Sequence, residues 1–438
     1  MGRAVGIGVG SDAFMVCVSG GEWKRVPAVL HLADGAPPVL GRAALAAEQA
    51  GRGAVFRDFT ERVGDPVPLF AGDHPYTGAE LLATAIGCLA GAGDEVMLAH
   101  PACWSDHASQ QLRNALARLA FPVTLVDEAE ATLIAAAEGP AVSGPGAVVL
   151  CDVGARYTDL SVLTPDSTGR MRLRHTERSA EFSGDLVDSL LLQHLLSAVA
   201  ETEPGFDPAA IADVRAIELL RNRIRVAKEQ LSACPAVTVD VELPGIRYAH
   251  RLVRAELEAL VEDSMRPVVD RVAARVEEAE RVQAARGAER SAEPRPRVLL
   301  SGGGSALPLL TEQLSAEITA PVVVLRDPAT TAVRGAAALA ARRIATRPPA
   351  AAHRVIPPSP ESVRRPRPTP DARSKASRPQ PAPAPPRFNS RRRAGWLVGA
   401  VAAIGVIAAG GVVAAEAVHA PAHSQTAPAV TVSQHGHH

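Results

Sequence analysis

The sequence predicts an α/β protein with two similar lobes, and three observations lead to that prediction. Two apolar stretches, residues 5–18 and 148–163, each alternate around a glycine-containing turn in the manner of a β-hairpin. Short strand patterns and helical patterns alternate between and after these hairpins. That order is typical of α/β folds, and the repeated hairpin indicates two lobes of one design.

The other elements of the body follow in chain order from the same patterns. Buried strands are predicted at residues 96–99 and 123–126, with a helix between them that Ser105 caps. Helices are predicted over residues 128–138, 184–200, 208–232 and 254–282. The body closes with a strand at 297–300, a glycine turn at 302–304, a helix over 308–317, a strand at 322–325 and a helix over 331–342.

The charge of the chain is unevenly distributed along its length. The 438 residues carry 46 Lys+Arg against 47 Asp+Glu, a net charge of −1. Residues 341–393 hold 14 basic and 2 acidic residues, which leaves −13 on the rest. An acidic body does not suit a protein that binds nucleic acid, so no nucleic-acid partner is expected. The five cysteines include no CxxC pair, which favours a reducing compartment.

The composition divides the chain into four predicted parts. Residues 1–345 form the folded body, and residues 346–393 form a disordered, basic linker, because 13 of the 36 prolines lie between 347 and 390. Residues 394–416 form a transmembrane helix, since residues 396–415 are uncharged and a helix of that length spans roughly 30 Å. Residues 417–438 form a short extracytoplasmic tail with histidines that either bind metal or are simply solvated. The basic linker predicts a single-pass protein of the inner (cytoplasmic) membrane with its body in the cytoplasm.

Three glycine turns, each following a strand, are the candidate sites for chemistry. They contain Gly8 and Gly10, Asp152 to Gly154, and Gly302 to Gly304. Glycine lets backbone N–H groups approach phosphate oxygens without interference from a Cβ atom. Two facing hairpins and a third glycine turn therefore predict a phosphate clamp between lobes, with a nucleoside site behind it.

The order of motifs over residues 5–345 carries a resemblance to a known family. The motifs are the first hairpin, residues 127–131 (Asp-Glu-Ala-Glu-Ala), residues 151–159, residues 227–232 (Ala-Lys-Glu-Gln-Leu-Ser), residues 300–305 (Leu-Ser-Gly-Gly-Gly-Ser) with Pro308, Asp327-Pro328 and residues 335–337 (Gly-Ala-Ala). In this order they resemble the ATPase domain of the DnaK-like heat-shock chaperones, in the actin/sugar-kinase superfamily. The resemblance implies a two-lobed actin-like ATPase fold that takes ATP or ADP with Mg²⁺.

The resemblance also implies roles for individual residues. Asp152 corresponds to the Mg²⁺ ligand, acting through water, and together with Glu128 and Asp159 it forms the implied catalytic set. The implied nucleotide contacts are Gly8, Gly10, Ser11, Gly154, Lys228, Ser232, Gly302, Gly303, Gly304 and Ser305.

Several positions depart from the family pattern. Gly8 stands where the family has a metal-side aspartate, and Asp12 stands where it has a threonine, which sets an unpaired carboxylate near a phosphate. Residues 56–62 hold no lysine where a catalytic lysine is expected, and Arg57 or Arg62 is the candidate substitute. Glu229 replaces an arginine that would stack on the base. With such charges missing, hydrolysis is expected to be slow or lost, since one preorganised contact is worth about 10²–10³ in rate.

Three functions remain open from the sequence. The first is a membrane-tethered nucleotide-binding protein without a peptide-binding domain, a switch or scaffold with weak or no ATPase activity, whose protein partner belongs to an envelope, division or secretion assembly. The second is an active, slow ATPase of a chaperone-like system. The third is a purely structural scaffold of the same fold, whose cleft Arg156 and Tyr157 fill.

Overall fold

The computed structural model describes residues 2–346, apart from residues 52, 138–145, 209–210, 212 and 287–294. The chain divides into two units, Met1–Val355 and Ile356–His438, and every described residue lies in the first. No helix within the described ranges is long and apolar enough to cross a membrane. The predicted membrane segment, residues 394–416, lies outside those ranges, as do the tail and nearly all of the linker.

The first lobe is built on a five-stranded sheet with the order β10-β9-β1-β2-β3. Its strands are β1 (Ala4–Val9), β2 (Ala13–Val18), β3 (Trp23–Pro27), β9 (Glu95–His100) and β10 (Val123–Asp127). The first three strands form an antiparallel meander, and β9 and β10 continue from β1 in parallel. Every residue of β9 is buried, as expected of a strand covered on both faces.

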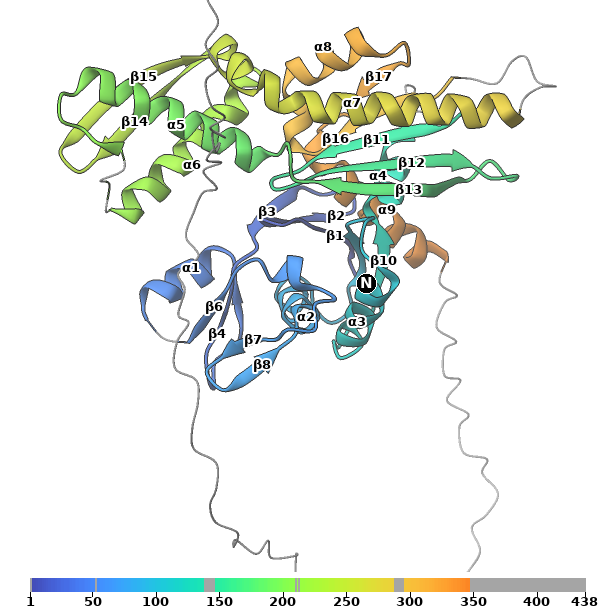
Figure 1. Ribbon diagram of the computed structural model, residues 1–438. Helices are drawn as coiled ribbons and strands as arrows, with labels where there is room; N and C mark the ends of the chain where they lie inside the picture. The colour runs from blue at the N-terminus through green and yellow to red at the C-terminus, as the bar shows by residue number, and fades with distance from the viewer. Residues whose placement is uncertain are drawn as a thin grey trace, which may run out of the picture. The chain divides into compact units, whose positions relative to one another are not determined.

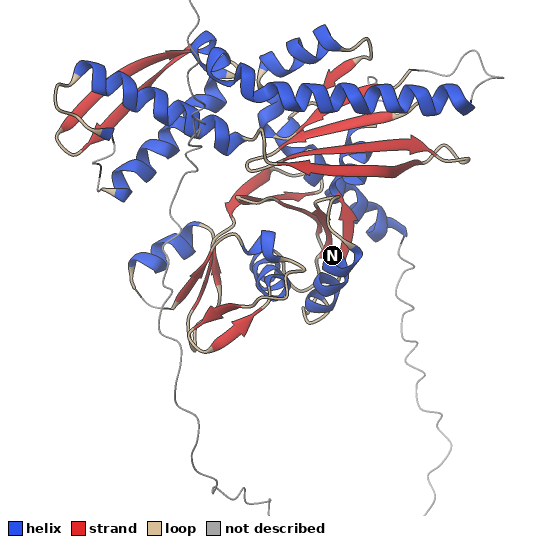
Figure 2. Ribbon diagram, viewed as in Figure 1, coloured by secondary structure: helices blue, strands red, loops and turns tan. Residues whose placement is uncertain are grey.

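The second lobe repeats this topology in a sheet with the order β13-β12-β11-β16-β17. Its strands are β11 (Val148–Val153), β12 (Thr158–Pro165), β13 (Met171–Ser179), β16 (Arg297–Ser301) and β17 (Val322–Val324). Again a three-stranded antiparallel meander is followed by two parallel strands (Figure 2). The two sheets confirm the prediction of two lobes of one design, and the structure is that of a mixed α/β protein of the actin-like ATPase type.

Smaller elements extend each lobe. Those of the first lobe are β4 (Leu30–Leu32), β5 (Val39–Leu40), α1 (Arg42–Gln49), β6 (Ala54–Phe56), the 3₁₀ helix η1 (Phe59–Arg62), β7 (Leu69–Ala71), β8 (His74–Tyr76), α2 (Gly78–Leu89) and α3 (Asp106–Leu116). Those of the second lobe are α5 (Gly184–Thr202), α6 (Val214–Leu231), β14 (Ala236–Leu243), β15 (Ile246–Val253), α7 (Arg254–Arg286), the 3₁₀ helices η3 (Gly303–Ala306) and η4 (Pro328–Thr330), and α8 (Pro308–Glu317). Figure 1 shows the long helix α7 running across the second sheet, which it contacts at β11, β12 and β16.

Two helices, α4 (Glu128–Ala136) and α9 (Thr331–Thr346), pack closely against each other. A Cβ atom on Gly335 of α9 would lie 1.8 Å from the carbonyl oxygen of Ala131 in α4. On the opposite side, a Cβ atom on Gly6 of β1 would lie 2.3 Å from the carbonyl oxygen of Val333. Only glycine permits these two contacts, so α9 is held against both β1 and α4.

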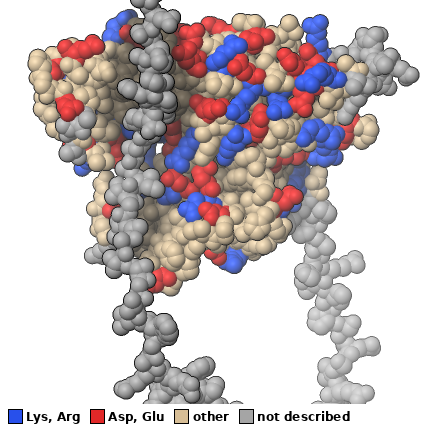
Figure 3. Space-filling model, viewed as in Figure 1, with Lys and Arg blue, Asp and Glu red and all other residues tan. Residues whose placement is uncertain are grey.

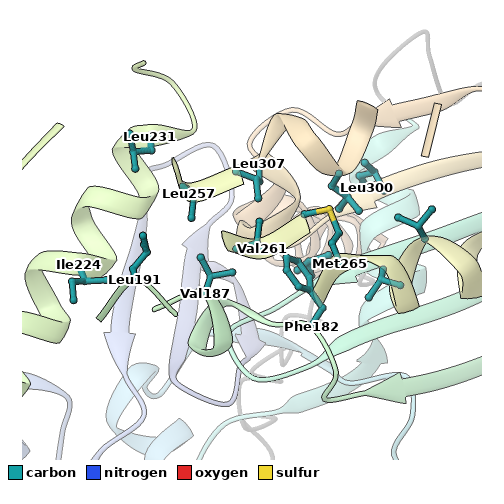
Figure 4. Close-up of a cluster of buried hydrophobic side chains, with 14 of the residues drawn as sticks. Phe182, Val187, Leu191, Ile224, Leu231, Leu257, Val261, Met265, Leu300 and Leu307 are labelled. Carbon is teal, nitrogen blue, oxygen red and sulfur yellow. The ribbon is translucent and has the colours of Figure 1, made fainter. Parts of the chain in front are cut away.

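The largest apolar core lies in the second lobe and joins the sheet to α5, α6 and α7. Figure 4 shows part of it, with Phe182, Leu191 and Leu300 among the buried side chains. Ion pairs add to this packing at the surface, where Arg275 of α7 lies 3.2 Å from Glu177 of β13 and Arg266 lies 2.9 Å from Glu317 of α8. On the face that Figure 3 shows, acidic and basic side chains are interspersed.

Most predicted elements are present, with shifted ends. The helix predicted over 308–317 is found as predicted, and Ser105 caps α3 by accepting a hydrogen bond from the Ala108 backbone N–H. The helix predicted from residue 208 begins instead at Val214, because the Asp213 side chain caps it by accepting from the Ala216 N–H. Residues 303–306 continue the predicted glycine turn as a 3₁₀ helix. The small sheets of the first lobe and the β14–β15 hairpin were not predicted.

Candidate functional site

A cavity of about 450 Å³ lies between the tips of the two hairpins. Its wall is formed by the β1–β2 turn of the first lobe, the β11–β12 turn of the second lobe, the 302–304 turn and one side of α6. The volume is within the range of roughly 300–1,000 Å³ that is usual for small-molecule sites. The cavity is therefore large enough for a nucleotide-sized ligand contacted by both lobes.

The glycines of these turns permit close backbone contacts. In the first hairpin the Gly10 N–H donates to the carbonyl oxygen of Ala13 at 3.2 Å, and in the second the Gly154 N–H donates to that of Tyr157 at 2.8 Å. Gly302 has a φ of +79°, and a Cβ atom there would lie 2.4 Å from the Val153 carbonyl oxygen. A side chain at residue 302 would thus be both strained and in collision with β11.

Four polar side chains cross the floor of the cavity on neighbouring strands. Ser301 of β16 is opposite Asp152 of β11, which is opposite Asp159 of β12, which in turn is opposite Arg178 of β13. Arg178 donates from Nε and Nη2 to the two carboxylate oxygens of Asp159, both at 2.8 Å. Asp159 is therefore paired with an arginine, whereas Asp152 has no arginine partner among the described residues.

Glu128, the first residue of α4, also lines the cavity and adds a third carboxylate. Burial raises the pKa of Glu128 well above its ordinary value, and the charges of Asp152 and Asp159 raise it further. Burial likewise raises the pKa of Asp152 to about 6, against a hydrogen bond from Ser301 that lowers it. Carboxyl groups that resist ionisation in this way are stabilised when a cation is bound beside them.

The residues present fit a hydrated divalent cation and a polar ligand. Asp152 is the carboxylate that would hold Mg²⁺ through water, as the resemblance implies, and Glu128 lines the same cavity. Thr60 lines the cavity, is 3% exposed, and its buried hydroxyl oxygen has no hydrogen-bond partner among the described residues. An unpartnered buried hydroxyl beside acidic groups favours a site that takes a polar ligand.

The cations around the cavity are already paired with acidic side chains. The Lys228 ammonium lies 2.6 Å from Asp188 and donates to the Gly184 carbonyl oxygen at 2.8 Å. Arg225 of α6 lies 3.2 Å from Asp12, to which Arg25 also donates. The expectation that Asp12 is an unpaired carboxylate is therefore wrong, because two arginines neutralise it.

Arg57 and Arg62, the predicted substitutes for a catalytic lysine, have other partners. Arg57 donates to both carboxylate oxygens of Glu48 at 2.8 and 2.7 Å, and Arg62 donates to Asp65 at 2.7 Å. Neither arginine lines the cavity, which is reached from this segment by Thr60 and Glu61. The prediction that Arg57 or Arg62 takes the place of the catalytic lysine is therefore wrong.

The structure brings nearly all of the predicted site residues to one place. Those that line the cavity are Gly8, Gly10, Ser11, Glu128, Asp152, Gly154, Asp159, Lys228, Ser232, Gly302, Gly303 and Gly304. Ser305 lies behind the turn, buried, with its hydroxyl donating to the Gly302 carbonyl oxygen at 2.7 Å. The roles of these residues in binding and catalysis stay predictions.

Sequence reasoning missed Arg178 and Arg225. Arg178 is 4.6 Å from the centre of the Tyr157 ring, and its charge reaches the acidic row only because β13 pairs with β12. The signal in the sequence is a second hairpin, in which residues 158–165 pair with residues 171–179 around a short turn. Recognising it would have placed Arg178 opposite Asp159. Arg225 shares α6 with Lys228 but meets Asp12 from a position 213 residues away.

The fold and the cavity define the class of the protein as a two-lobed nucleotide-binding domain of the actin-like ATPase type. A family model described as Hsp70 protein matches residues 83–344, more than half of the chain. The chain therefore belongs to the Hsp70 family, and its body is a DnaK-like ATPase domain.

Curated relatives agree with this assignment. The chain is 33% identical over 235 residues to proteins named chaperone protein HscA homolog from Burkholderia pseudomallei and Burkholderia mallei. It is 32% identical over the same length to the protein of that name from Burkholderia thailandensis. The matched part covers 53% of this chain and 35% of each relative. Similarity thus extends over about a third of the relatives' length.

Proposed function

We propose that the body binds ATP or ADP with Mg²⁺ and acts as a nucleotide-dependent switch or scaffold with slow or no hydrolysis. The observation that carries this proposal is the cavity between glycine turns of both lobes, in which the available cations are already paired with carboxylates. Family membership supports nucleotide binding in general. The slow turnover is our inference from the charges.

The charge argument follows from what phosphoryl transfer needs. Bound Mg²⁺ would neutralise charge on the phosphates. Beyond it, transfer is accelerated by protein cations that are free to meet the charge developing on the phosphoryl group. Lys228 and Arg225 are both paired with Asp188, and Thr60 and Glu61 occupy the segment where the resemblance implies a lysine. A missing preorganised cation costs about 10²–10³ in rate, which would leave binding largely to the backbone amides and the glycine turns.

Three ion pairs support a switch that works by movement of the lobes. Each joins an arginine of the second lobe to an acid of the first: Arg156 with Asp58, Arg178 with Glu61 at 3.7 Å, and Arg225 with Asp12 at 3.2 Å. Partly exposed pairs contribute about 0–1 kcal/mol each. Together they are comparable to the few kcal/mol that separate two populated conformations, so a bound nucleotide could shift the balance.

Tethering to a membrane is part of the proposal and is supported by composition. Residues 394–416 are long and apolar enough for one span, and the basic segment before them favours a body on the cytoplasmic side of the inner membrane. The partner would then be a membrane-associated protein assembly of the envelope, division or secretion type.

Calorimetric titration of the full-length chain with ATP and ADP, with and without Mg²⁺, tests the proposal. We expect binding that Mg²⁺ strengthens, and a turnover rate at or below detection. Glu128→Gln should weaken the Mg²⁺ dependence, while Asp166→Asn, in the exposed β12–β13 turn, should leave it unchanged. Fast Mg²⁺-dependent turnover would contradict the proposal, and a folded chain that binds neither nucleotide would leave only the scaffold.

A second candidate, an active but slow ATPase, is favoured by one observation. Arg178 is a cation inside the cavity, and its guanidinium could leave Asp159 for a phosphate. If so, Arg178→Gln should remove the residual turnover and leave the affinity for ADP nearly unchanged. The third candidate, a closed scaffold, is disfavoured because Arg156 pairs with Asp58 at the rim and about 450 Å³ remain open.

A further inference from the structure

A cluster of metal-binding side chains lies away from the nucleotide cavity, where α5, β15 and α7 meet. His194 is on α5, His250 is on β15 and Glu256 is in the first turn of α7 (Figure 1). One ligand atom from each of the three residues lies within 4.8 Å of the others. None of these residues lines the nucleotide cavity.

We propose that His194, His250 and Glu256 form a site for a divalent transition metal, with Zn²⁺ the best-suited ion. Two imidazoles and a carboxylate are a usual three-ligand set for Zn²⁺, with water in the fourth position. The set carries one negative charge when both histidines are neutral, which suits a divalent cation. Neither the nucleotide site nor its proposed activity is needed for this site.

The histidine nitrogens support the proposal because they lack other partners. The Nε2 atoms of His194 and His250 are both buried and have no hydrogen-bond partner among the described residues. Leaving a buried polar atom unpaired is unfavourable, and the two rings that carry these atoms lie close together, with centroids 5.6 Å apart. One ion between them would satisfy both nitrogens at once.

Hydrogen bonds from neighbouring residues also hold two of the three ligand side chains in place. The Nδ1 atom of His250 lies 3.4 Å from the Tyr248 hydroxyl oxygen, and a proton on Nδ1 leaves the Nε2 lone pair for a metal. Glu256 accepts the Val253 N–H at 2.8 Å through Oε2, which holds the side chain and leaves Oε1 available.

The geometry requires only a small adjustment. Zn–N bonds of about 2.0–2.1 Å in a tetrahedral site place two ligand atoms about 3.3 Å apart, against the 4.8 Å limit of this cluster. We expect rotation of the three side chains to bring the ligand atoms to that spacing when the ion binds. A bound ion would then join α5, the strand β15 and the start of α7. Helix α7 also contacts both α5 and β15 directly.

The test uses the full-length chain and Co²⁺ as a coloured probe, followed by competition with Zn²⁺. We expect one equivalent with the absorption of a four-coordinate site, displaced by Zn²⁺. His194→Gln and His250→Gln should each weaken the affinity by more than about 10–100-fold, because loss of outer partners alone costs that much. His175→Gln is the matched control, since this histidine also lies near a carboxylate, 3.8 Å from Glu177, outside the cluster.

The histidines of the C-terminal tail need a control of their own. A chain with all five of them (His419, His423, His435, His437 and His438) replaced by alanine should keep the same equivalent. Glu256→Gln can keep the hydrogen bond from the Val253 N–H, so this variant tests the site even if a histidine variant fails to fold. Zn²⁺ should also raise the melting temperature of the wild-type chain and not that of Glu256→Gln. Binding that survives both histidine substitutions, or the absence of binding by the folded chain, would overturn the proposal.

Discussion

Removing the charge of Asp152 should make the ligand-free body more stable while impairing its response to Mg²⁺. Burial raises the pKa of this carboxyl from 3.8 to about 6, so the folded protein resists its ionisation. Below pH 3.8 the carboxyl is protonated in both states and costs nothing. As the pH rises from 3.8 to about 6, the carboxyl ionises in the unfolded chain but stays protonated in the folded one, so the free energy of unfolding falls. Above about 6 it is ionised in both states, and the free energy of unfolding stays lower by the full amount.

The size of the effect follows from the same values. A rise from 3.8 to about 6 corresponds to about 3 kcal/mol, at about 1.4 kcal/mol for each pH unit. Asparagine keeps an oxygen for Ser301 but lacks the charge, and the neighbouring Glu128 readjusts its own proton. We therefore expect Asp152→Asn to stabilise the ligand-free chain by about 1–3 kcal/mol at pH 7.5, with the gain shrinking toward zero near pH 4.

Urea unfolding followed by circular dichroism, at pH 7.5 and at pH 4.5 without Mg²⁺, measures this difference. Addition of ATP with Mg²⁺ should then stabilise the wild-type chain and have little effect on Asp152→Asn. Asp166→Asn is the control of opposite sign, because hydrogen bonds from Thr168 and Arg172 lower the pKa of Asp166. If Asp152→Asn were no more stable than the wild type at pH 7.5, the reasoning about buried charge would be refuted.

Three further predictions test the turns, the lobe contacts and the core. Gly302→Ala forces a φ of +79° on an L residue and sets its Cβ atom 2.4 Å from the Val153 carbonyl oxygen. Calorimetry should therefore show ATP binding at least about 10-fold weaker, and an unchanged affinity would contradict the role of the turn. Asp12→Asn removes a negative charge beside the first glycine turn and one of the carboxylate partners of Arg225, 3.2 Å away, so titration should show ATP binding severalfold tighter at low salt; weaker binding would show that the pairing itself shapes the site. Phe59→Ala removes a fully buried ring, and urea unfolding should show a loss of about 3–5 kcal/mol; a loss under about 1 kcal/mol would mean that this part of the first lobe unfolds separately.

The local sequence predicted the elements whose patterns are self-contained. Both hairpins, the buried strands and the helices capped by Ser105 or begun by Pro308 follow from alternation, apolar runs and capping chemistry, which act within a few residues. The small strands of the first lobe gave no such signal. β5 has 2 residues and β4, β6, β7 and β8 have 3 each, so their hydrogen-bonding partners rather than their own propensity determine them.

What the sequence by itself determined is the fold class, the lobe repeat and the glycine turns and carboxylates that meet at one cavity. They meet because each hairpin turn lies at the same edge of its sheet as the carboxyl ends of the parallel strands beside it. What only the tertiary structure decided is which charges are free. Arg178 reaches Asp159 through strand pairing, Arg225 reaches Asp12 from a distant helix, and Arg57 and Arg62 face away. Ion pairing acts over a few ångströms in space and is independent of distance along the chain, so no local pattern encodes it.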